Sequence, residues 1–301
     1  MSQTKALLFP GQGSQFSGML SYIGLSSSTI LNKYQFEIDE FSKIINFDFI
    51  NLIENKEHEE LLSQTQYTQP ALLFTSCLAF NELITDKDGF NYFAGHSLGE
   101  YSALVCANSM SLIDALHLVY RRGNLMASAP KGAMSAVLGL DINIIDEVCN
   151  SLTHDGFIVQ SANKNTPLQT VISGSIDGIT KAEEILKDRG AKRVIRLNVS
   201  VASHSSLMKD ISHEFLQYLE EIEFSMPVKK IIQNVSIDTP ENLEILKMNL
   251  VSQLYSPVNW VATMNKLSAS SLLVECGPGK VLTGLGKQNN VNVSELLNYL
   301  G

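Results

Sequence analysis

The sequence feature that most constrains the fold is Phe93–Tyr101, which reads F-A-G-H-S-L-G-E-Y. An apolar run leads into the segment Gly95–Gly99, and the residues after it suit a helix. This G-x-S-x-G pattern is typical of a nucleophile elbow, in which a sharp strand-to-helix turn exposes the serine at a helix N-terminus. Glycines on both sides of Ser97 let the strand and the helix approach without a Cβ between them. The pattern therefore predicts a buried strand, a reactive Ser97 and a helix, in that order.

The composition is that of a globular enzyme and argues against some classes of function. The chain has 301 residues, of which 45% are hydrophobic and 18% charged. Its net charge of −9 argues against nucleic acid as a partner. The apolar run near the N-terminus ends at Pro10 and is too short for a signal peptide or a membrane span. We therefore expect no membrane association.

The cysteines indicate a reducing compartment. Cys77, Cys106, Cys149 and Cys276 are far apart and form no C-x-x-C pair. They are expected to be buried thiols that form neither a disulfide framework nor a metal site. We therefore predict a cytoplasmic protein without a metal.

The first part of the chain predicts a parallel α/β sheet. Ala6–Phe9 suits a buried strand, which opens into the small-residue loop Gly11–Gln15. Thr68 or Gln69 can cap a helix with Pro70 in its first turn, and the apolar residues that follow predict that this helix is buried. Helix, strand, elbow and helix then alternate, as they do in parallel sheets.

A change of pattern after Lys131 predicts an inserted unit. The segments from 132 to 197 follow the order β-α-β-β-α-β, which is that of a small ferredoxin-like unit. We therefore expect an α/β fold with an α/β-hydrolase-like catalytic subdomain, residues 1–128 and 200–301, and a ferredoxin-like small subdomain, residues 129–199. Residues 205–220 are expected to form one helix of the larger subdomain.

A serine nucleophile needs a base, and histidine is the usual one at neutral pH. His204 follows a predicted strand and precedes a predicted helix, which is where catalytic groups of α/β proteins gather. His96 is next to Ser97, but on an elbow its side chain should point away from the nucleophile. The acidic residues between Ser97 and His204 lack a strand-end setting. The simpler interpretation is a serine–histidine dyad whose histidine is oriented by a backbone carbonyl.

Motifs along almost the whole length resemble the malonyl-CoA:acyl-carrier-protein transacylases of bacterial fatty-acid synthesis. They are G-Q-G-S-Q at 11–15, T-Q-P-A-L at 68–72, G-H-S-L-G-E at 95–100, R-G-N-L-M at 122–126, G-A-M-S-A-V-L-G at 132–139, N-x-N-x-P-x-Q-x-V-I-S-G at 163–174, V-S-V-A-S-H-S at 199–205, Q-L-Y-S-P-V-x-W at 253–260 and E-C-G-P-G at 275–279. So many motifs in one order leave little room for coincidence.

The resemblance implies a role for individual residues. Ser97 matches the serine that is acylated in the family, and His204 matches its base. The backbone amides of Gln12 and Leu98 match the oxyanion hole. Three further residues match substrate-side positions: Arg122 matches the arginine that binds the malonyl carboxylate, Gln253 the residue whose carbonyl orients the histidine, and Asn163 a position in a loop that faces the active site.

The resemblance also implies the partners. They are a coenzyme A thioester and, transiently, an acyl carrier protein, with no cofactor and a monomeric enzyme. Because carrier proteins of this pathway are acidic, this acidic chain needs a local basic patch. Candidates are Lys192, Arg193 and Arg196, with Lys280 and Lys287 as further basic residues near the cleft-side loops.

Departures from the family pattern leave alternatives open. Tyr22–Thr29 is shorter and richer in serine than the usual connection, and Ser203 precedes His204 where malonyl-selective modular polyketide acyltransferases have phenylalanine. One alternative is therefore an acyltransferase that supplies malonyl or a related unit to a polyketide synthase. A serine esterase or thioesterase is a second, which Arg122 and the missing acid disfavour. A non-catalytic binding module is a third, which the complete set of site residues disfavours.

Overall fold

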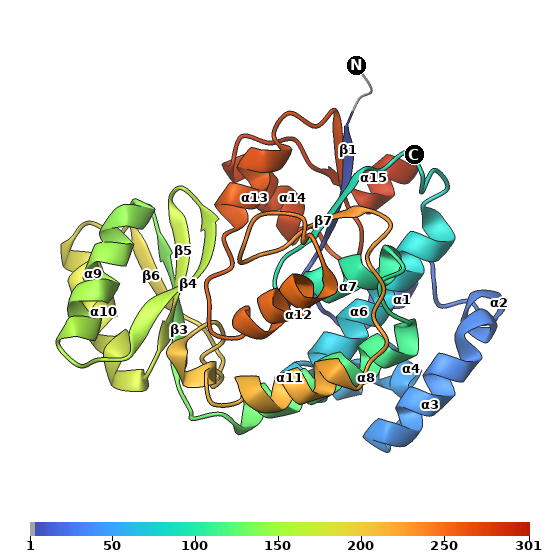
Figure 1. Ribbon diagram of the computed structural model, residues 1–301, viewed down its shortest axis with the longest axis horizontal. Helices are drawn as coiled ribbons and strands as arrows, with labels where there is room; N and C mark the ends of the chain where they lie inside the picture. Colours follow the sequence, from blue (N-terminus) through green and yellow to red (C-terminus); the bar gives the residue numbers. More distant parts are fainter. Residues whose placement is uncertain (1–3) are drawn as a thin grey trace.

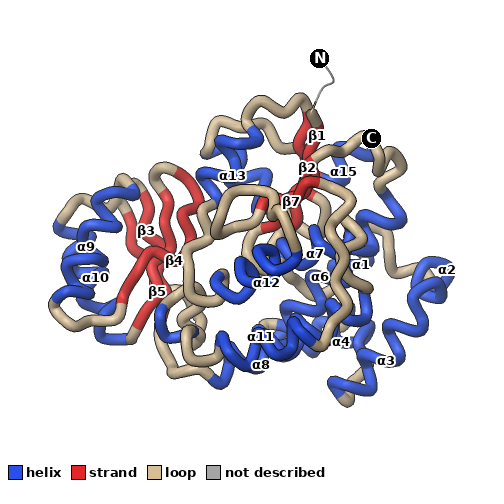
Figure 2. The backbone as a smooth tube through the Cα atoms, viewed as in Figure 1, coloured by secondary structure: helices blue, strands red, loops and turns tan. Residues whose placement is uncertain are grey.

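The computed structural model describes residues 4–301 and contains two β-sheets (Figure 1). The larger sheet has the strand order β7-β2-β1-β8-β9, and all its pairings are parallel. The smaller sheet has the order β4-β5-β3-β6 and is antiparallel. In Figure 2 the smaller sheet and its two helices form the left end of the molecule. The predicted α/β class is therefore confirmed.

The larger sheet lies in the middle of its subdomain, with helices on both faces. Its central strand β1 is wholly apolar and buried from Ala6 to Phe9, because a parallel sheet covered on both faces exposes no side to water. The register pairs Phe9 with Gly95 and Leu8 with Glu275. The strands are β1 (Lys5–Phe9), β2 (Tyr92–Gly95), β7 (Lys230–Ile232), β8 (Leu272–Glu275) and β9 (Ser294–Glu295).

The helices of the larger subdomain are mostly short, and none in the described part of the chain is long and apolar enough to cross a membrane. The α-helices are α1 (Met19–Tyr22), α2 (Ser28–Leu31), α3 (Gln35–Ile45), α4 (Phe49–Glu54), α5 (Glu59–Leu62), α6 (Thr65–Leu83), α7 (Gly99–Cys106), α8 (Leu112–Ser128), α11 (Ser212–Glu220), α12 (Leu243–Ser252), α13 (Trp260–Leu267), α14 (Val281–Gln288) and α15 (Leu296–Leu300). Short 3₁₀ turns are η1 (Asn32–Tyr34), η2 (Lys56–His58) and η3 (Ser206–Met208).

The smaller sheet has the connectivity expected of a ferredoxin-like unit. Its elements are β3 (Ala133–Leu138), α9 (Ile142–His154), β4 (Val159–Thr166), β5 (Gln169–Gly174), α10 (Ile176–Asp188) and β6 (Arg193–Arg196). The first strand, β3, pairs with both β5 and β6, which gives the order 4-1-3-2 for the four strands. The topology confirms the predicted small unit, while its boundaries at 129 and 199 stay a prediction.

The edge strand β4 joins the two subdomains. Val258 donates its N–H to the Ala162 carbonyl and accepts the N–H of Lys164, at 2.8 and 2.9 Å. Strand β4 is irregular there, with register shifts between Ser161 and Asn163 and between Lys164 and Thr166. Such bulges redirect a strand edge. The small subdomain therefore presents β4 residues to the larger one.

The predicted start of α6 is wrong. The helix begins at Thr65, so Thr68 and Gln69 lie inside it and Pro70 is its sixth residue. Proline at this position lacks the N–H that would bond the Gln66 carbonyl. Fourteen residues of α6 are nevertheless buried, and this packing holds the helix although one of its bonds is missing.

The predicted single helix over 205–220 is also wrong, because serines interrupt it. The structure has a 3₁₀ turn at Ser206–Met208 and starts α11 at Ser212. The Ser205 hydroxyl donates to the Ala202 carbonyl and the Ser212 hydroxyl to the Lys209 carbonyl. Local bonds of this kind compete with helical ones.

The glycines around Ser97 are required by close contact between backbones. A Cβ on Gly95 would lie 1.8 Å from the carbonyl carbon of Gly99, and a Cβ on Gly99 would lie 2.0 Å from the carbonyl oxygen of Phe9. Real Cβ atoms do not approach backbone so closely, so β1, β2 and α7 can meet only if both positions are glycine. Ser97 itself has φ +50, in the left-handed region that costs a non-glycine residue energy.

We expect Gly95→Ala and Gly99→Ala to destabilise the protein by about 3 kcal/mol or more, because backbone atoms cannot move aside. Gly284→Ala is the matched control: it lies in α14 with open space around its Cβ position, and should be neutral or stabilising by up to about 1 kcal/mol. Urea unfolding followed by circular dichroism measures all three. Normal stability of both elbow variants would contradict this account.

Candidate active site

Ser97 lies between β2 and α7, and a side-chain amide fixes its backbone. The Ser97 N–H donates to Asn234 Oδ1 at 2.7 Å, and Asn234 Nδ2 donates to the Gly95 carbonyl at 2.6 Å. Asn234 follows β7, the neighbour of β2 in the sheet. One buried amide therefore holds both ends of the turn that presents the Ser97 hydroxyl.

His204 contacts Ser97 directly. Its Nε2 lies 2.8 Å from the Ser97 Oγ, and its Nδ1 lies 2.7 Å from the backbone carbonyl oxygen of Gln253. A carbonyl can only accept, so Nδ1 carries the proton and Nε2 is free to accept the serine proton. No carboxylate is needed to set this tautomer. The structure thus brings together the predicted nucleophile, the predicted base and the predicted orienting residue.

Burial keeps His204 neutral. His204 is 3% exposed. Its burial and, as a smaller effect, the positive charge of Arg122 lower the pKa of His204 to about 3. The neutral imidazole is the form that can accept a proton from a serine hydroxyl.

The loop that carries His204 is fixed from both subdomains. The His204 N–H donates to the Leu254 carbonyl at 2.9 Å, and its φ of +58 is left-handed. From β4, the Gln160 side chain donates to the carbonyls of His204 and Tyr255, at 3.0 and 3.1 Å. The small subdomain therefore helps to position the histidine.

Arg122 is buried in α8 without a carboxylate partner among the described residues. Its guanidinium donates to Gln69 Oε1 at 2.7 Å and to Gln253 Oε1 at 3.1 Å, and it lies over the ring of Tyr101. Its Nε has no hydrogen-bond partner in the described part of the chain. Arg122 is only 2% exposed. An arginine has five N–H donors, and three of them remain free here. It is a ready-made site for a planar anion such as a carboxylate.

The preceding residue, Arg121, differs from Arg122 in both exposure and partners. It is exposed, forms an ion pair with Glu221 at 2.5 Å and stacks on Tyr218. Neighbours on a helix point about 100° apart. Only Arg122 of this pair reaches the interior.

The loop of Gln12 packs against the elbow. A Cβ on Gly11 would lie 2.3 Å from the His96 carbonyl oxygen, so the loop backbone touches the turn. The Gln12 side chain accepts from Thr65 Oγ1 at 3.0 Å, and Leu98 is the N-cap of α7. Neither the Gln12 nor the Leu98 backbone N–H donates to any residue within 4–301. Both amides are therefore available to a ligand.

His96 points away from the nucleophile, as expected. Its Nε2 lies 2.8 Å from Asn165 Oδ1, and its ring packs edge-on against Trp260. Asn163, predicted to lie in a loop, lies inside β4 instead, where it pairs with Val171 and bridges to Val258. The bulges of β4 explain the error, because they give a strand the irregular sequence of a loop.

The predicted basic residues lie on or next to two separate elements, β6 and α14. Arg193 and Arg196 are the first and last residues of β6, and Lys192 precedes them. Strand β6 forms the edge of the small sheet opposite to β4. All three are exposed, and Arg196 forms an ion pair with Glu183 at 2.7 Å. Lys280 and Lys287 are exposed at the two ends of α14.

Sequence reasoning missed three amide side chains that hold the site, namely Gln69, Gln160 and Asn234. The sequence indicates Gln69 only as one of two possible helix caps, with Thr68, although its place in T-Q-P-A-L is a further signal. The sequence predicts a strand near residues 230–234, which marks Asn234 only as the end of a strand, and Gln160 has no signal. Amides give weak sequence signals because their importance depends on partners far along the chain.

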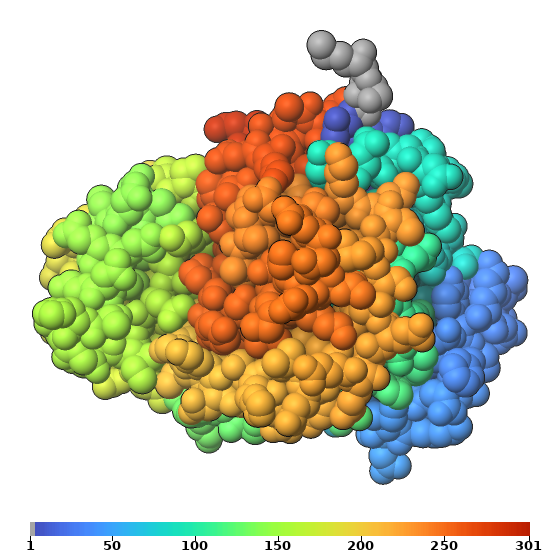
Figure 3. Space-filling model, viewed as in Figure 1, coloured from blue at the N-terminus to red at the C-terminus, as the bar shows by residue number. Residues whose placement is uncertain are grey.

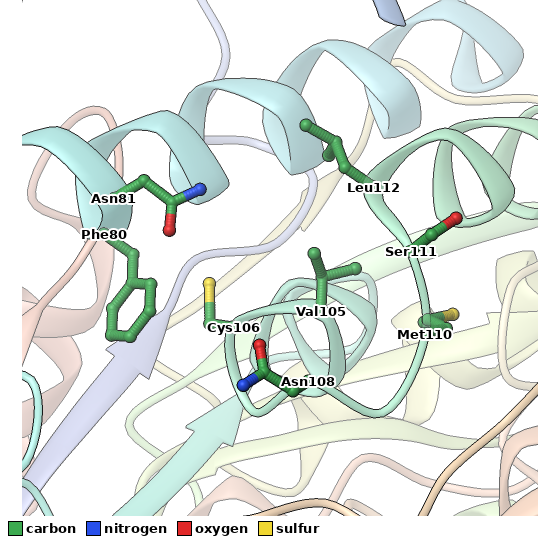
Figure 4. A pocket seen from close by; sticks show the side chains of 8 residues that line it. All are labelled: Phe80, Asn81, Val105, Cys106, Asn108, Met110, Ser111 and Leu112. Atoms are coloured by element: carbon green, nitrogen blue, oxygen red, sulfur yellow. The ribbon is translucent and has the colours of Figure 1, made fainter.

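Other features of the described residues do not add to this site. A cavity of about 220 Å³ is lined by the end of α6, the end of α7 with Cys106, the α7–α8 connection with Asn108, and the start of α8 (Figure 4). It contains none of the predicted site residues.

Within residues 4–301 no cluster of three or more His, Cys, Asp or Glu could hold a metal ion. The four cysteines are buried and free. In the view of Figure 3, the C-terminal third of the chain covers the middle of the molecular surface, beside the small subdomain.

Comparison with known proteins agrees with this site. Residues 6–295 match the acyl transferase domain family. The chain is 40% identical over 290 residues to a malonyl CoA-acyl carrier protein transacylase of Bacillus subtilis, covering 95% of this chain and 90% of that protein.

Solved structures give the same answer. The malonyl CoA-acyl carrier protein transacylase of Coxiella burnetii superimposes with a TM-score of 0.90 at 34% identity, covering 100% of this chain and 96% of that one. A malonyl-transacylase solved in complex with a type II polyketide-synthase acyl-carrier protein has a TM-score of 0.88 at 38% identity, covering 97% and 94%. The chain belongs to the acyl transferase domain family and, within it, to the malonyl CoA-acyl carrier protein transacylases.

Proposed function

We propose that this enzyme transfers the malonyl group from malonyl-CoA to the phosphopantetheine thiol of an acyl carrier protein, through a malonyl ester on Ser97. The observation that carries the proposal is a buried, carboxylate-free Arg122 linked through the single residue Gln253 to the Ser97–His204 pair. This combination of a nucleophile and an unpaired buried cation suits an acyl group that ends in a carboxylate.

In the first half of the reaction His204 accepts the Ser97 proton while Oγ attacks the thioester carbonyl. The C–S bond then breaks, and coenzyme A leaves as a thiolate that takes the proton from His204. In the second half the carrier thiol gives its proton to His204 and its sulfur attacks the ester carbonyl. The C–O bond to Ser97 then breaks, and the Ser97 oxygen takes the proton back from His204. This ping-pong sequence needs no cofactor, and a thiolate is a good enough leaving group for a dyad without an acid.

The free amides of Gln12 and Leu98 supply the oxyanion hole in this proposal. The negative charge of the tetrahedral intermediate develops beside the elbow, where the first turn of α7 begins. Removing one such donor typically costs about 3–4 kcal/mol of transition-state stabilisation. Because both donors belong to the backbone, side-chain substitutions at Gln12 and Leu98 should leave the donors in place.

Arg122 supplies the choice of acyl group. A malonyl carboxylate can accept two parallel N–H bonds from the guanidinium, whereas an acetyl group leaves the buried cation unpaired. A site built for a polar group rejects its absence strongly, so discrimination of about 10³-fold or more is expected. Asn163, inside β4, is proposed as a further residue on the substrate side.

The partner in this proposal is an acidic acyl carrier protein that docks transiently on a monomer. A similar malonyl-transacylase has been solved with a carrier protein. For this chain Lys192, Arg193 and Arg196 remain the proposed docking residues, with Lys280 and Lys287 as further candidates. Since Arg196 is paired with Glu183, Lys192 and Arg193 are the freer charges. The proposed compartment is the cytoplasm.

Service to a polyketide synthase is the second candidate, because that solved complex contains a polyketide carrier protein. A thioesterase is disfavoured because hydrolysis has no use for Arg122. Parallel assays with a fatty-acid and a polyketide carrier protein separate the first two, by the ratio of their kcat/KM values.

Incubation with malonyl-CoA should give a covalent malonyl adduct that intact-protein mass spectrometry detects. The adduct should be absent in Ser97→Ala and normal in Ser26→Ala, which removes an exposed hydroxyl. It should persist in water and disappear on addition of a pantetheine thiol. An adduct in Ser97→Ala would overturn the assignment, and rapid release in water would favour the thioesterase.

Arg122→Ala should lower malonyl loading by about 10²-fold or more and leave acetyl loading equal or higher. The matched control is Arg121→Ala, which removes the neighbouring but exposed guanidinium and should change neither rate by more than about twofold. Single-turnover mass spectrometry with the two coenzyme A esters measures both. If wild-type protein loads acetyl and malonyl equally, Arg122 does not select the acyl group.

Because of the low pKa of His204, the free energy of unfolding should decrease as the pH is lowered. Its folded pKa of about 3 lies below the unfolded value of about 6.5, so the unfolded chain binds a proton first as the pH drops below 6.5. Between pH 7.5 and 5.5 wild type should therefore lose about 1.4 kcal/mol more unfolding free energy than His204→Gln. Urea titrations at both pH values measure this, and equal losses would show that His204 is not buried in its neutral form.

A further inference from the structure

The site contains a buried carboxylate for which the proposed reaction has no role. Glu100 lies in the first turn of α7 and is 1% exposed. An acidic residue near a helix N-terminus stabilises a helix even on the surface. A surface position would suffice for that purpose, so the burial of Glu100 needs another explanation.

Three N–H donors converge on the two oxygens of Glu100. Oε2 accepts from the Asn234 backbone N–H and from Gln253 Nε2, each at 2.9 Å. Oε1 accepts from Gln233 Nε2 at 3.0 Å. All three partners are themselves buried. Such a set of donors suits an acceptor without protons, which is an ionised carboxylate.

Through Asn234 the carboxylate reaches the nucleophile. Glu100 holds the Asn234 backbone, and the Asn234 side chain holds the Ser97 N–H and the Gly95 carbonyl. Ser97 keeps a left-handed φ, a strained state that persists only where its surroundings enforce it. Glu100 therefore holds Asn234, the residue that keeps Ser97 in this left-handed conformation.

Through Gln253 the carboxylate reaches the base and the arginine. The backbone carbonyl of Gln253 accepts from His204, and its side-chain Oε1 accepts from Arg122. The side-chain Nε2 donates to Glu100 and also lies 3.2 Å from the Ser97 carbonyl. One residue thus contacts the base, the cation and the elbow.

The orientation of the Gln253 amide depends on Glu100. An amide presents an oxygen on one side and an NH₂ on the other. Arg122 can only donate and requires the oxygen, while an ionised Glu100 can only accept and requires the NH₂. The reversed amide would place donor against donor at Arg122. The amide therefore links Glu100 to Arg122 by two oriented hydrogen bonds without a direct ion pair, which leaves the guanidinium unneutralised.

We propose that Glu100 is a positioning residue that aligns both halves of the site, the Ser97–His204 pair and the Arg122 cation, through Asn234 and Gln253. The inference rests on the proposed malonyl transfer through Ser97. Its chemistry differs from that of a triad acid, because Glu100 contacts neither His204 nor the reacting atoms and acts through two amides.

Burial raises the pKa of Glu100 to about 7, while its three hydrogen bonds and the charge of Arg122 hold it down. At pH 8 the carboxylate is therefore mostly ionised. The other titratable groups of this region do not change charge near that pH: His204 has its pKa lowered, and burial raises the pKa of Tyr101 far above its usual range. Tests at pH 8 consequently report on the ionised form.

Two substitutions at Glu100 give a graded test. Glu100→Gln keeps one oxygen, which can still accept from Asn234 and Gln253, but loses the charge and turns its NH₂ towards Gln233. Glu100→Met has a similar length and offers no acceptor to either residue. The matched control is Glu59→Gln, which removes an exposed charge from the first turn of α5. Folding is checked by thermal unfolding, and rates are referred to folded protein.

The experiment is single-turnover loading of Ser97 at pH 8, followed by intact mass over a range of malonyl-CoA concentrations. We expect the maximal rate to fall about 5- to 10-fold in Glu100→Gln and about 100-fold in Glu100→Met, because buried donors lose a charged acceptor. The half-saturating concentration should rise in both, since Arg122 loses its alignment. A purely structural role would lower the folded fraction and change neither quantity.

A folded Glu100→Met with both quantities within about twofold of wild type would overturn the proposal. If Glu100→Met does not fold, Glu100→Gln decides by the same criterion. Glu59→Gln should behave as wild type, and an equal loss in that variant would also count against a specific role. Failure of wild-type protein to form the malonyl adduct would refute the proposed function itself, whereas normal loading of the variants would refute only this inference.

Discussion

The close approach of three backbone segments at the elbow is the constraint on which the rest of the structure depends. Strand β1, the turn after β2 and the start of α7 are in contact at Gly95 and Gly99, where a Cβ would overlap backbone atoms. This contact pushes Ser97 out of the sheet with a left-handed backbone. The neighbouring Gln12 loop, which follows β1, comes to the same place because β1 and β2 are paired in register.

Around this turn the protein uses neutral amides in place of ion pairs. Gln69 and Gln253 contact Arg122, Asn234 fixes Ser97, and a backbone carbonyl orients His204. A carboxylate in direct contact with Arg122 would satisfy the cation and compete with an anionic substrate. Amides orient the guanidinium while leaving it unneutralised, so the buried charge stays available to an anionic ligand.

The two subdomains contribute to one site because β4 is both an edge strand and a contact surface. Its bulged middle bonds to Val258, and Gln160 within it holds the His204 loop. Any relative displacement of the subdomains would therefore change the position of the base relative to Ser97. The inserted unit therefore helps to hold the His204 loop in place.

The sequence by itself determined the elements whose causes are local. Spacing, glycines and hydrophobic pattern predict the elbow, the apolar central strands, the β-α-β-β-α-β order and the loop position of His204. The motifs indicate the family. The tertiary structure alone decided the true start of α6, the strand position of Asn163 and the contacts of Gln69, Gln160, Asn234 and Glu100. An amide or a buried carboxylate gains its meaning from partners that are remote in the chain, as when Glu100 meets Gln253. Local patterns record the cost of a turn or an apolar face, whereas a hydrogen bond between distant polar groups exists only after the fold has brought them together.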